Sequence, residues 1–140
     1  YVLVEKRRRL KKEFFGQNIR ELSKDKSIIL NETYEKRLFS YAVDVARVDP
    51  KDIEDSKLLF VDSTFLNIED RNEEKLSHFT IEEAYNLAKE SNVENVVFMH
   101  LSKRYDWEQF NLYLKEKTDY KNDFKSVTVL NPNIVNHLKY

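Results

Sequence analysis

The chain has 140 residues, the length of a single domain or of part of one, and its net charge of −1 excludes a general electrostatic attraction to nucleic acid. Hydrophobic residues make up 41% of the chain, which predicts one globular domain over residues 1–140, and the absence of cysteine excludes disulfides and thiolate metal sites. No apolar run approaches the roughly 18 residues of a membrane span and no apolar signal segment begins the chain, so no membrane contact and a cytoplasmic location are expected.

The first 43 residues predict strands around one helix. Apolar spacing predicts a strand over Tyr1–Lys6, a helix over Phe15–Lys24, and strands over Ser27–Leu30 and Arg37–Val43 with a turn at residues 31 and 32. The aromatic and aliphatic residues of this helix region are expected in the core: Phe14, Phe15, Ile19 and Leu22. The basic run Arg7–Lys12 is either a solvated face or an edge that meets phosphates.

Two predicted strands end on a carboxylate. Asp44 follows the apolar end of Arg37–Val43, and Asp62 follows the buried run Leu58–Val61. Between them, an Asp before Pro50 predicts a helix N-cap with proline at the first helical position. Each carboxylate could instead serve only as a cap or a turn residue at the strand end.

Histidines occupy two comparable positions. His78 precedes Thr80, which with Glu83 predicts a capping box at a helix start, and His100 follows the strand Asn95–Met99. A loop over residues 67–75, a helix over Trp107–Lys117 and a last strand over Ser126–Leu130 complete the chain, and His137 is expected at the surface of the tail.

Alternating strands and helices with short connections predict an α/β sheet. Ligand sites in such sheets lie at the carboxyl ends of the strands, so we expect Asp44, Asp62, His78 and His100 to converge at one edge. Imidazole and carboxylate groups suit zinc, with manganese as the alternative.

Four short segments, in order, resemble the C-terminal half of ribonuclease Z, the transfer-RNA 3′-processing endonuclease of the metallo-β-lactamase fold. These segments are Tyr41-Ala42-Val43-Asp44-Val45, Val61-Asp62-Ser63-Thr64-Phe65, His78-Phe79-Thr80 before Glu82-Glu83-Ala84, and Met99-His100-Leu101-Ser102-Lys103-Arg104-Tyr105. The resemblance implies an αββα sandwich, of which this chain is the C-terminal half: a mixed sheet with covering helices.

The resemblance also implies a role for each residue. Asp44 and His100 would be metal ligands in a site for two zinc ions, and Asp62 and His78 would form the catalytic pair that protonates the leaving 3′ oxygen. Arg104 and Ser102 would hold a phosphate of precursor tRNA, with pairing of Arg104 to a surface carboxylate such as that of Asp106 as the alternative.

The sequence also departs from the family pattern. Val43 and Val45 replace the family's Gly and Thr beside the bridging Asp, Asp62 replaces a Glu, and no His-x-His-x-Asp-His cluster is present. We therefore expect a missing N-terminal half, a complementary chain or a homodimer to complete the site. Two alternatives stay open: another hydrolase of this fold, such as a cyclic-nucleotide phosphodiesterase, and a non-catalytic remnant that serves binding or dimerisation.

Overall fold

The computed structural model describes residues 1–45, 47–71 and 78–130. These form two compact units, one of residues 1–3 with 37 onwards and one of residues 4–36. The single domain expected over residues 1–140 stays a prediction, and His137 and part of the expected loop over residues 67–75 lie outside the described residues.

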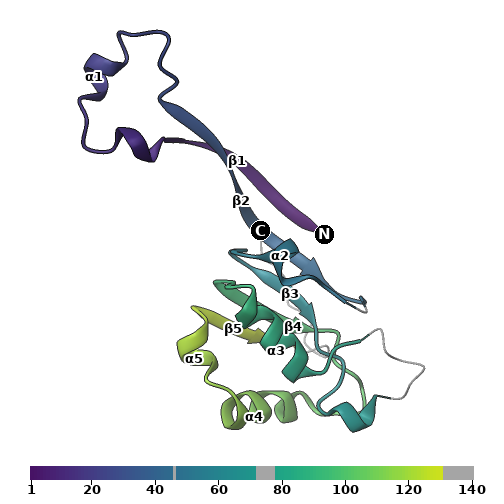
Figure 1. Ribbon diagram of the computed structural model, residues 1–140. Helices are drawn as coiled ribbons and strands as arrows, with labels where there is room; N and C mark the ends of the chain where they lie inside the picture. Colours follow the sequence, from purple (N-terminus) through teal and green to yellow (C-terminus); the bar gives the residue numbers. More distant parts are fainter. Residues whose placement is uncertain (46, 72–77, 131–140) are drawn as a thin grey trace, which may run out of the picture. The chain divides into compact units, whose positions relative to one another are not determined.

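A five-stranded sheet, in the order β1-β2-β3-β4-β5, organises the chain (Figure 1). Strands β2 to β5 run parallel to their neighbours. Strand β1 runs antiparallel to β2, because the start of one meets the end of the other: Tyr41 N donates to Tyr1 O at 2.7 Å, and Lys11 N donates to Leu30 O at 2.9 Å. The sheet is therefore mixed, as expected. The strands are β1 Val2–Leu10, β2 Asn31–Ala42, β3 Leu59–Asp62, β4 Asn95–Met99 and β5 Ser126–Val129.

Helices connect the parallel strands, because the chain must cross over to return to the start of the next strand. Helix α2 (Pro50–Ile53) precedes β3, α3 (Ile81–Glu90) joins β3 to β4, and α4 (Trp107–Lys117) and α5 (Tyr120–Asp123) join β4 to β5. The predicted caps are confirmed: Asp49 accepts from Lys51 N at 2.9 Å, and Thr80 and Glu83 form a capping box. Each helix therefore begins where its cap predicts.

The first face of the sheet carries the core. Leu59, Val61, Val96 and Phe98 are at most 1% exposed, and they share one cluster with the buried residues of α2, α3 and α4. The register pairs Leu59 with Val96 and Val61 with Phe98. Because paired residues of neighbouring strands point to the same face, these four side chains lie on one face of the sheet. The helices of this unit pack against this face.

The second face of the sheet is apolar but only half-buried. It is formed by Phe39, Tyr41, Phe60, Val97 and Met99, in which Tyr41, Phe60 and Val97 are aligned across three strands. The Phe60 ring lies 6.2 Å from both the Phe39 and the Tyr41 ring. We refer to these five residues as the second face.

The unit of residues 4–36 differs from its sequence prediction. The strands β1 and β2 are longer than predicted, and the expected strand Ser27–Leu30 and the turn at residues 31 and 32 are wrong, because β2 already begins at Asn31. The expected ten-residue helix is replaced by a 3₁₀ turn, Lys12–Phe14, and one short helix, α1 (Ile19–Leu22).

The apolar residues of this unit are also not core. Phe15 is 62% exposed, and none of the described residues of the unit is buried. Apolar periodicity predicts a helix only where a core can receive its apolar face, and here such a core is absent.

Candidate active site

The three strand-end residues lie where the sheet topology predicts. Asp62 is the last residue of β3, His100 follows β4, and Asp44 lies two residues after β2. Asp44 and His100 both have left-handed backbone, with φ of 59° and 64°. Few non-glycine residues adopt this conformation, so the chain turns sharply at both strand ends.

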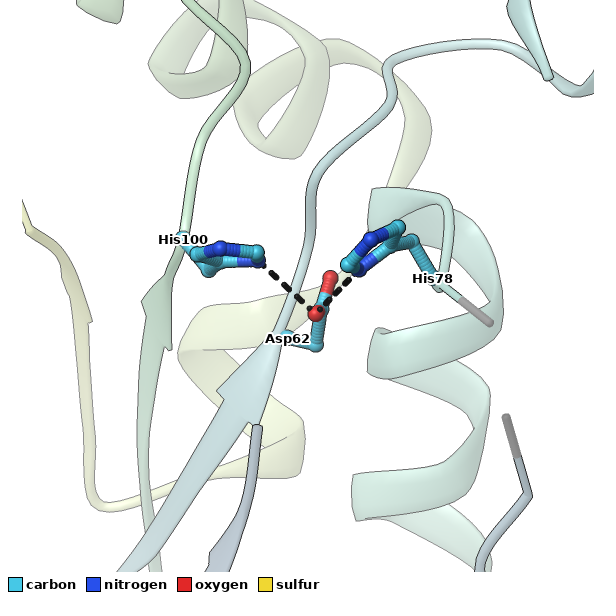
Figure 2. A group of neighbouring side chains, drawn as sticks. All are labelled: Asp62, His78 and His100. Carbon is cyan, nitrogen blue, oxygen red and sulfur yellow. Dashed lines mark hydrogen bonds and ion pairs between the residues drawn. The ribbon is translucent and has the colours of Figure 1, made fainter. Parts of the chain in front are cut away.

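The Asp62 carboxylate is the centre of the site (Figure 2). Its side chain is fully buried, and Oδ2 lies 3.0 Å from Nδ1 of His78 and 3.0 Å from Nδ1 of His100. The same oxygen accepts from Asp44 N at 3.1 Å. A carboxylate only accepts hydrogen bonds, so each Nδ1 carries its hydrogen and each Nε2 is the nitrogen left for other partners.

Thr64 completes the shell around Asp62. Its backbone N donates to Oδ1 of Asp62 at 3.0 Å and its hydroxyl donates to the same oxygen at 2.7 Å. The Thr64 hydroxyl also lies 3.1 Å from Nδ1 of His100. Thr64 therefore ties the end of β3 to the end of β4 through side-chain contacts.

His78 reaches the site from the start of α3. The capping box at Thr80 fixes this helix start, and Phe65 N donates to Phe79 O while Ile81 N donates to Phe65 O. The two imidazole rings face Asp62 from opposite sides, with ring centroids 5.1 Å apart. Helix α3 thus brings His78 to the edge where β3 and β4 end.

Asp44 lies at the rim of the site. Its side chain is 75% exposed, and its Oδ1 lies 3.8 Å from Nε2 of His78. The sequence-predicted residues Asp44, Asp62, His78 and His100 are thus brought together. Their catalytic and ligand roles stay predictions.

Arg104 and Ser102 follow His100 along the chain, and Ser102 N donates to the Thr64 carbonyl at 3.0 Å. Nη1 of Arg104 donates to the carbonyl of Asp70 at 3.3 Å, and Ser102 Oγ accepts from Arg104 N at 3.4 Å. Arg104 makes no ion pair with Asp106 among the residues that the structure describes. Its phosphate role stays a prediction. Next to Arg104, burial and then the neighbouring Asp70 carboxylate raise the pKa of Tyr105 to about 12.

Two contributing residues were not singled out by the sequence. Thr64 belongs to one of the four segments, and a hydroxyl two residues after a strand-end Asp is a common hydrogen-bond partner for that Asp. Arg71 donates from Nη1 to the carbonyl of His78 at 3.2 Å and to Oε2 of Glu83 at 2.9 Å. No sequence signal connects Arg71 to His78, because the contact runs from a single side chain to a backbone carbonyl seven residues further along.

The donor set suits a divalent metal ion. Asp62, His78 and His100 each offer one ligand atom, and these atoms all lie within 4.8 Å of one another. Because Asp62 accepts from Nδ1 of both histidines, the nitrogens left for a metal ion are the two Nε2 atoms. The arrangement of a carboxylate on Nδ1 of each imidazole also matches the outer shell that orients metal-binding histidines. The residues therefore fit a metal centre.

Comparison with solved structures identifies the fold. The chain is similar to the metallo-β-lactamase fold protein YhfI from Bacillus subtilis, with a TM-score of 0.50 and 18% identity over 74% of this chain and 42% of that one. The fold is that of the metallo-β-lactamases. This confirms the predicted metallo-β-lactamase fold class, with a mixed sheet and covering helices.

One curated relative shares sequence with part of this chain. The chain is 43% identical over 51 residues to ribonuclease Z from Methanocaldococcus jannaschii, which covers 36% of this chain and 16% of that protein. The match thus spans about one sixth of the relative's length, and the assignment to the C-terminal half stays a prediction. No family model matches the chain. Among the described helices, none combines the length and apolar character needed to cross a bilayer.

Proposed function

We propose that this chain is part of a metal-dependent phosphodiesterase that cleaves precursor tRNA at its 3′ end. One observation carries the proposal: a buried carboxylate, Asp62, that holds the imidazoles of His78 and His100 at 3.0 Å each, on the metallo-β-lactamase fold. The partial match to ribonuclease Z supports RNA as the substrate.

In this proposal His78 is the proton donor. Asp62 accepts from Nδ1 of His78 and fixes the ring, so Nε2 faces the rim of the site where Asp44 lies 3.8 Å away. A carboxylate behind an imidazole stabilises its protonated form and its orientation. Nε2 is then the atom that delivers a proton to the leaving 3′ oxygen.

Asp44 and His100 are the proposed metal ligands. The exposed carboxylate of Asp44 takes no part in the hydrogen bonds to Asp62. The ring of His100 is held through Nδ1, which contacts Asp62 and Thr64, and Nε2 is the atom proposed to bind metal. When bound, a pair of zinc or manganese ions supplies stabilisation of negative charge on the phosphate oxygens. Arg104 and Ser102 are proposed to hold a neighbouring phosphate.

The unit of residues 4–36 supports RNA as the partner. It contains ten Lys and Arg residues and six Asp and Glu residues, although the whole chain has a net charge of −1. Arg7 and Arg9 are paired with Glu5 and Glu32, whereas Arg8 and Lys12 are exposed and have no ion pair among the described residues. Exposed cations of this kind contact the phosphates of a nucleic acid without recognising its base sequence.

We further propose that a second β-sheet covers the second face. The apolar side chains of this face are half-buried, and the chain matches only 42% of the B. subtilis structure of the same fold. An N-terminal half or a complementary chain would supply this layer, and also the further metal ligands that a two-metal site needs. A homodimer that uses the same face is the alternative outcome.

The test combines cleavage with metal analysis. The purified chain is assayed with precursor tRNA in zinc or manganese, alone and after addition of an N-terminal half with a His-x-His-x-Asp-His cluster. We expect 3′ cleavage only in the completed protein, and its loss in His78→Ala and in Asp44→Ala. Absence of cleavage and of metal in the completed protein would contradict the proposal and favour a binding module.

A second measurement tests the RNA contact. Each phosphate contact that is lost lowers the slope of log affinity against log salt by about 1. The double variant Arg8→Ala, Lys12→Ala should therefore bind tRNA more weakly, with a slope about 2 smaller. The matched control is Lys115→Ala, Lys117→Ala in α4, which should bind as the wild type does. Equal slopes in all three proteins would exclude contact by residues 4–36.

A further inference from the structure

The side chain of Arg71 contacts the backbone of His78, on the other side of positions 72–77. Arg71 ends the segment that follows β3, and His78 begins the segment that leads into α3. Nη1 of Arg71 donates to the carbonyl oxygen of His78 at 3.2 Å. The contact is direct, from a guanidinium to the backbone of a residue whose ring contacts Asp62.

The same nitrogen of Arg71 is anchored by an ion pair. Nη1 lies 2.9 Å from Oε2 of Glu83, and the Arg71 side chain is 15% exposed. Oε2 of Glu83 also accepts from Thr80 N at 2.8 Å, as the second half of the capping box. Glu83 therefore joins the guanidinium to the first turn of α3, and the partly buried pair is less screened by solvent than a surface pair.

These contacts restrict the backbone of His78. The carbonyl of His78 is fixed by Arg71, the next residues are fixed by the bridge between Phe65 and Thr80, and the ring is fixed by Asp62. A side chain keeps a precise position only when its backbone does, because a small shift of the Cα atom moves the ring out of hydrogen-bond distance.

We infer that Arg71 is a positioning residue, whose guanidinium holds the His78 backbone so that the His78 imidazole meets the Asp62 carboxylate. The inference rests on the proposed function only for its catalytic meaning. The positioning itself is a property of the folded chain. Nothing in this inference requires a bound metal or a substrate.

The chain offers a matched control for the loss of a guanidinium. Arg37 donates to two backbone carbonyls, of Glu54 at 2.8 Å and of Lys51 at 3.1 Å, and so ties β2 to α2. Arg37→Met therefore removes a similar number of hydrogen bonds as Arg71→Met, outside the site. Arg71→Lys keeps a cation that can donate to both acceptors.

The test follows the imidazole signals of the metal-free, ¹⁵N-labelled full chain by NMR. In the wild type, the Nδ1 proton of His78 should be protected by its bond to Asp62. We expect Arg71→Met to lose this proton signal or to broaden it, with the His100 signals retained. Arg71→Lys should restore it, and Arg37→Met should leave it unchanged.

The outcomes that would overturn the inference are equally direct. A His78 Nδ1 proton that is as protected in Arg71→Met as in the wild type would exclude positioning by Arg71. An equal loss in Arg37→Met would show general destabilisation instead. Should Arg71→Met not fold, Glu83→Gln decides, because it removes the charge that anchors Arg71 and keeps one amide oxygen that can accept from Thr80 N. Unchanged His78 signals in that variant would overturn the inference even if tRNA cleavage is later demonstrated, and altered signals would support it even if cleavage is never found.

Discussion

Asp62 shows how one buried side chain can determine the arrangement of a whole site. Its two oxygens accept from Asp44 N, from the backbone and hydroxyl of Thr64, and from the Nδ1 atoms of His78 and His100. These donors come from three strand ends and one helix start. The family's longer Glu is not needed for contact with His78, since the shorter Asp62 already reaches it at 3.0 Å.

Removal of this carboxylate should therefore affect stability as well as chemistry. Asp62→Ala leaves several donors without an acceptor in a fully buried position, and loss of one partner from a buried charged network costs about 3 kcal/mol. Urea unfolding followed by circular dichroism measures this loss. Asp52→Ala, at an exposed position, is the control and should change the free energy of unfolding by less than about 0.5 kcal/mol.

The Tyr85–Asp123 pair should give the molecule an alkaline limit of stability. Burial, and then the hydrogen bond to Asp123, raises the pKa of Tyr85 to about 12 from an unfolded value near 10. The folded state thus keeps this proton where the unfolded state loses it. The stabilisation is fully present below pH 10 and is lost as the pH rises through about 12.

Tyr85→Phe tests this dependence. Thermal unfolding between pH 9 and pH 11 should show a fall in stability for the wild type that is smaller in Tyr85→Phe. Identical alkaline profiles for wild type and Tyr85→Phe would contradict the assignment.

At the acid end, the hydrogen bond from Tyr85 and then that from Lys89 lower the pKa of Asp123. The contribution of Asp123 to the stability of the fold is therefore present above the unfolded value of 3.8 and is lost as the pH falls through the folded pKa.

At the scale of elements, α3 links stability to the site. Thr80 caps this helix, accepts from Glu83 N at 3.1 Å and lies two residues after His78. Thr80→Ala should reduce the free energy of unfolding by about 1 kcal/mol. The same variant should increase hydrogen exchange in the first turn of α3, as measured by mass spectrometry, with no change in α4. A uniform increase in both helices would indicate global unfolding instead.

The sequence predicted the elements of the larger unit well. The strand Asn95–Met99 and the helix Trp107–Lys117 have the predicted bounds, β3 is shifted by one residue at each end, and β5 is one residue shorter at its C-terminal end. These segments are buried, so their apolar pattern reflects the contacts that they make. The caps at Asp49 and Thr80 depend on local chemistry alone, and both were predicted.

Prediction failed where burial does not determine structure. Between residues 4 and 36 no described residue is buried, so the apolar spacing of Phe15 and Ile19 carried no information about a helix face. The candidate site was predictable because strand ends converge in any parallel sheet. The roles of Thr64 and Arg71 were not, because a single side-chain contact leaves no periodic signal in the sequence.

At the scale of the whole molecule, the second face is the surface through which we propose that the chain associates. Large exposed apolar surfaces favour contact between proteins. Without a second layer, the chain should self-associate through this face, and Phe60→Thr with Val97→Thr should weaken the association about tenfold or more in sedimentation experiments. Leu112→Thr is the control, since Leu112 is 54% exposed on α4, away from the sheet. Equal association of both variants would place the contact elsewhere.

The left-handed backbone at Asp44 has a consequence for how the sequence can change over evolutionary time. An L-residue in this conformation costs about 1–2 kcal/mol, which glycine avoids, and the Asp44 side chain is 75% exposed with few contacts to lose. Asp44→Gly should therefore raise the free energy of unfolding by about 1 kcal/mol, whereas Asp44→Ala should not. Selection for stability alone would therefore favour glycine at this position. Descendants of this chain that no longer need the activity should be recognisable by this glycine and by a higher melting temperature.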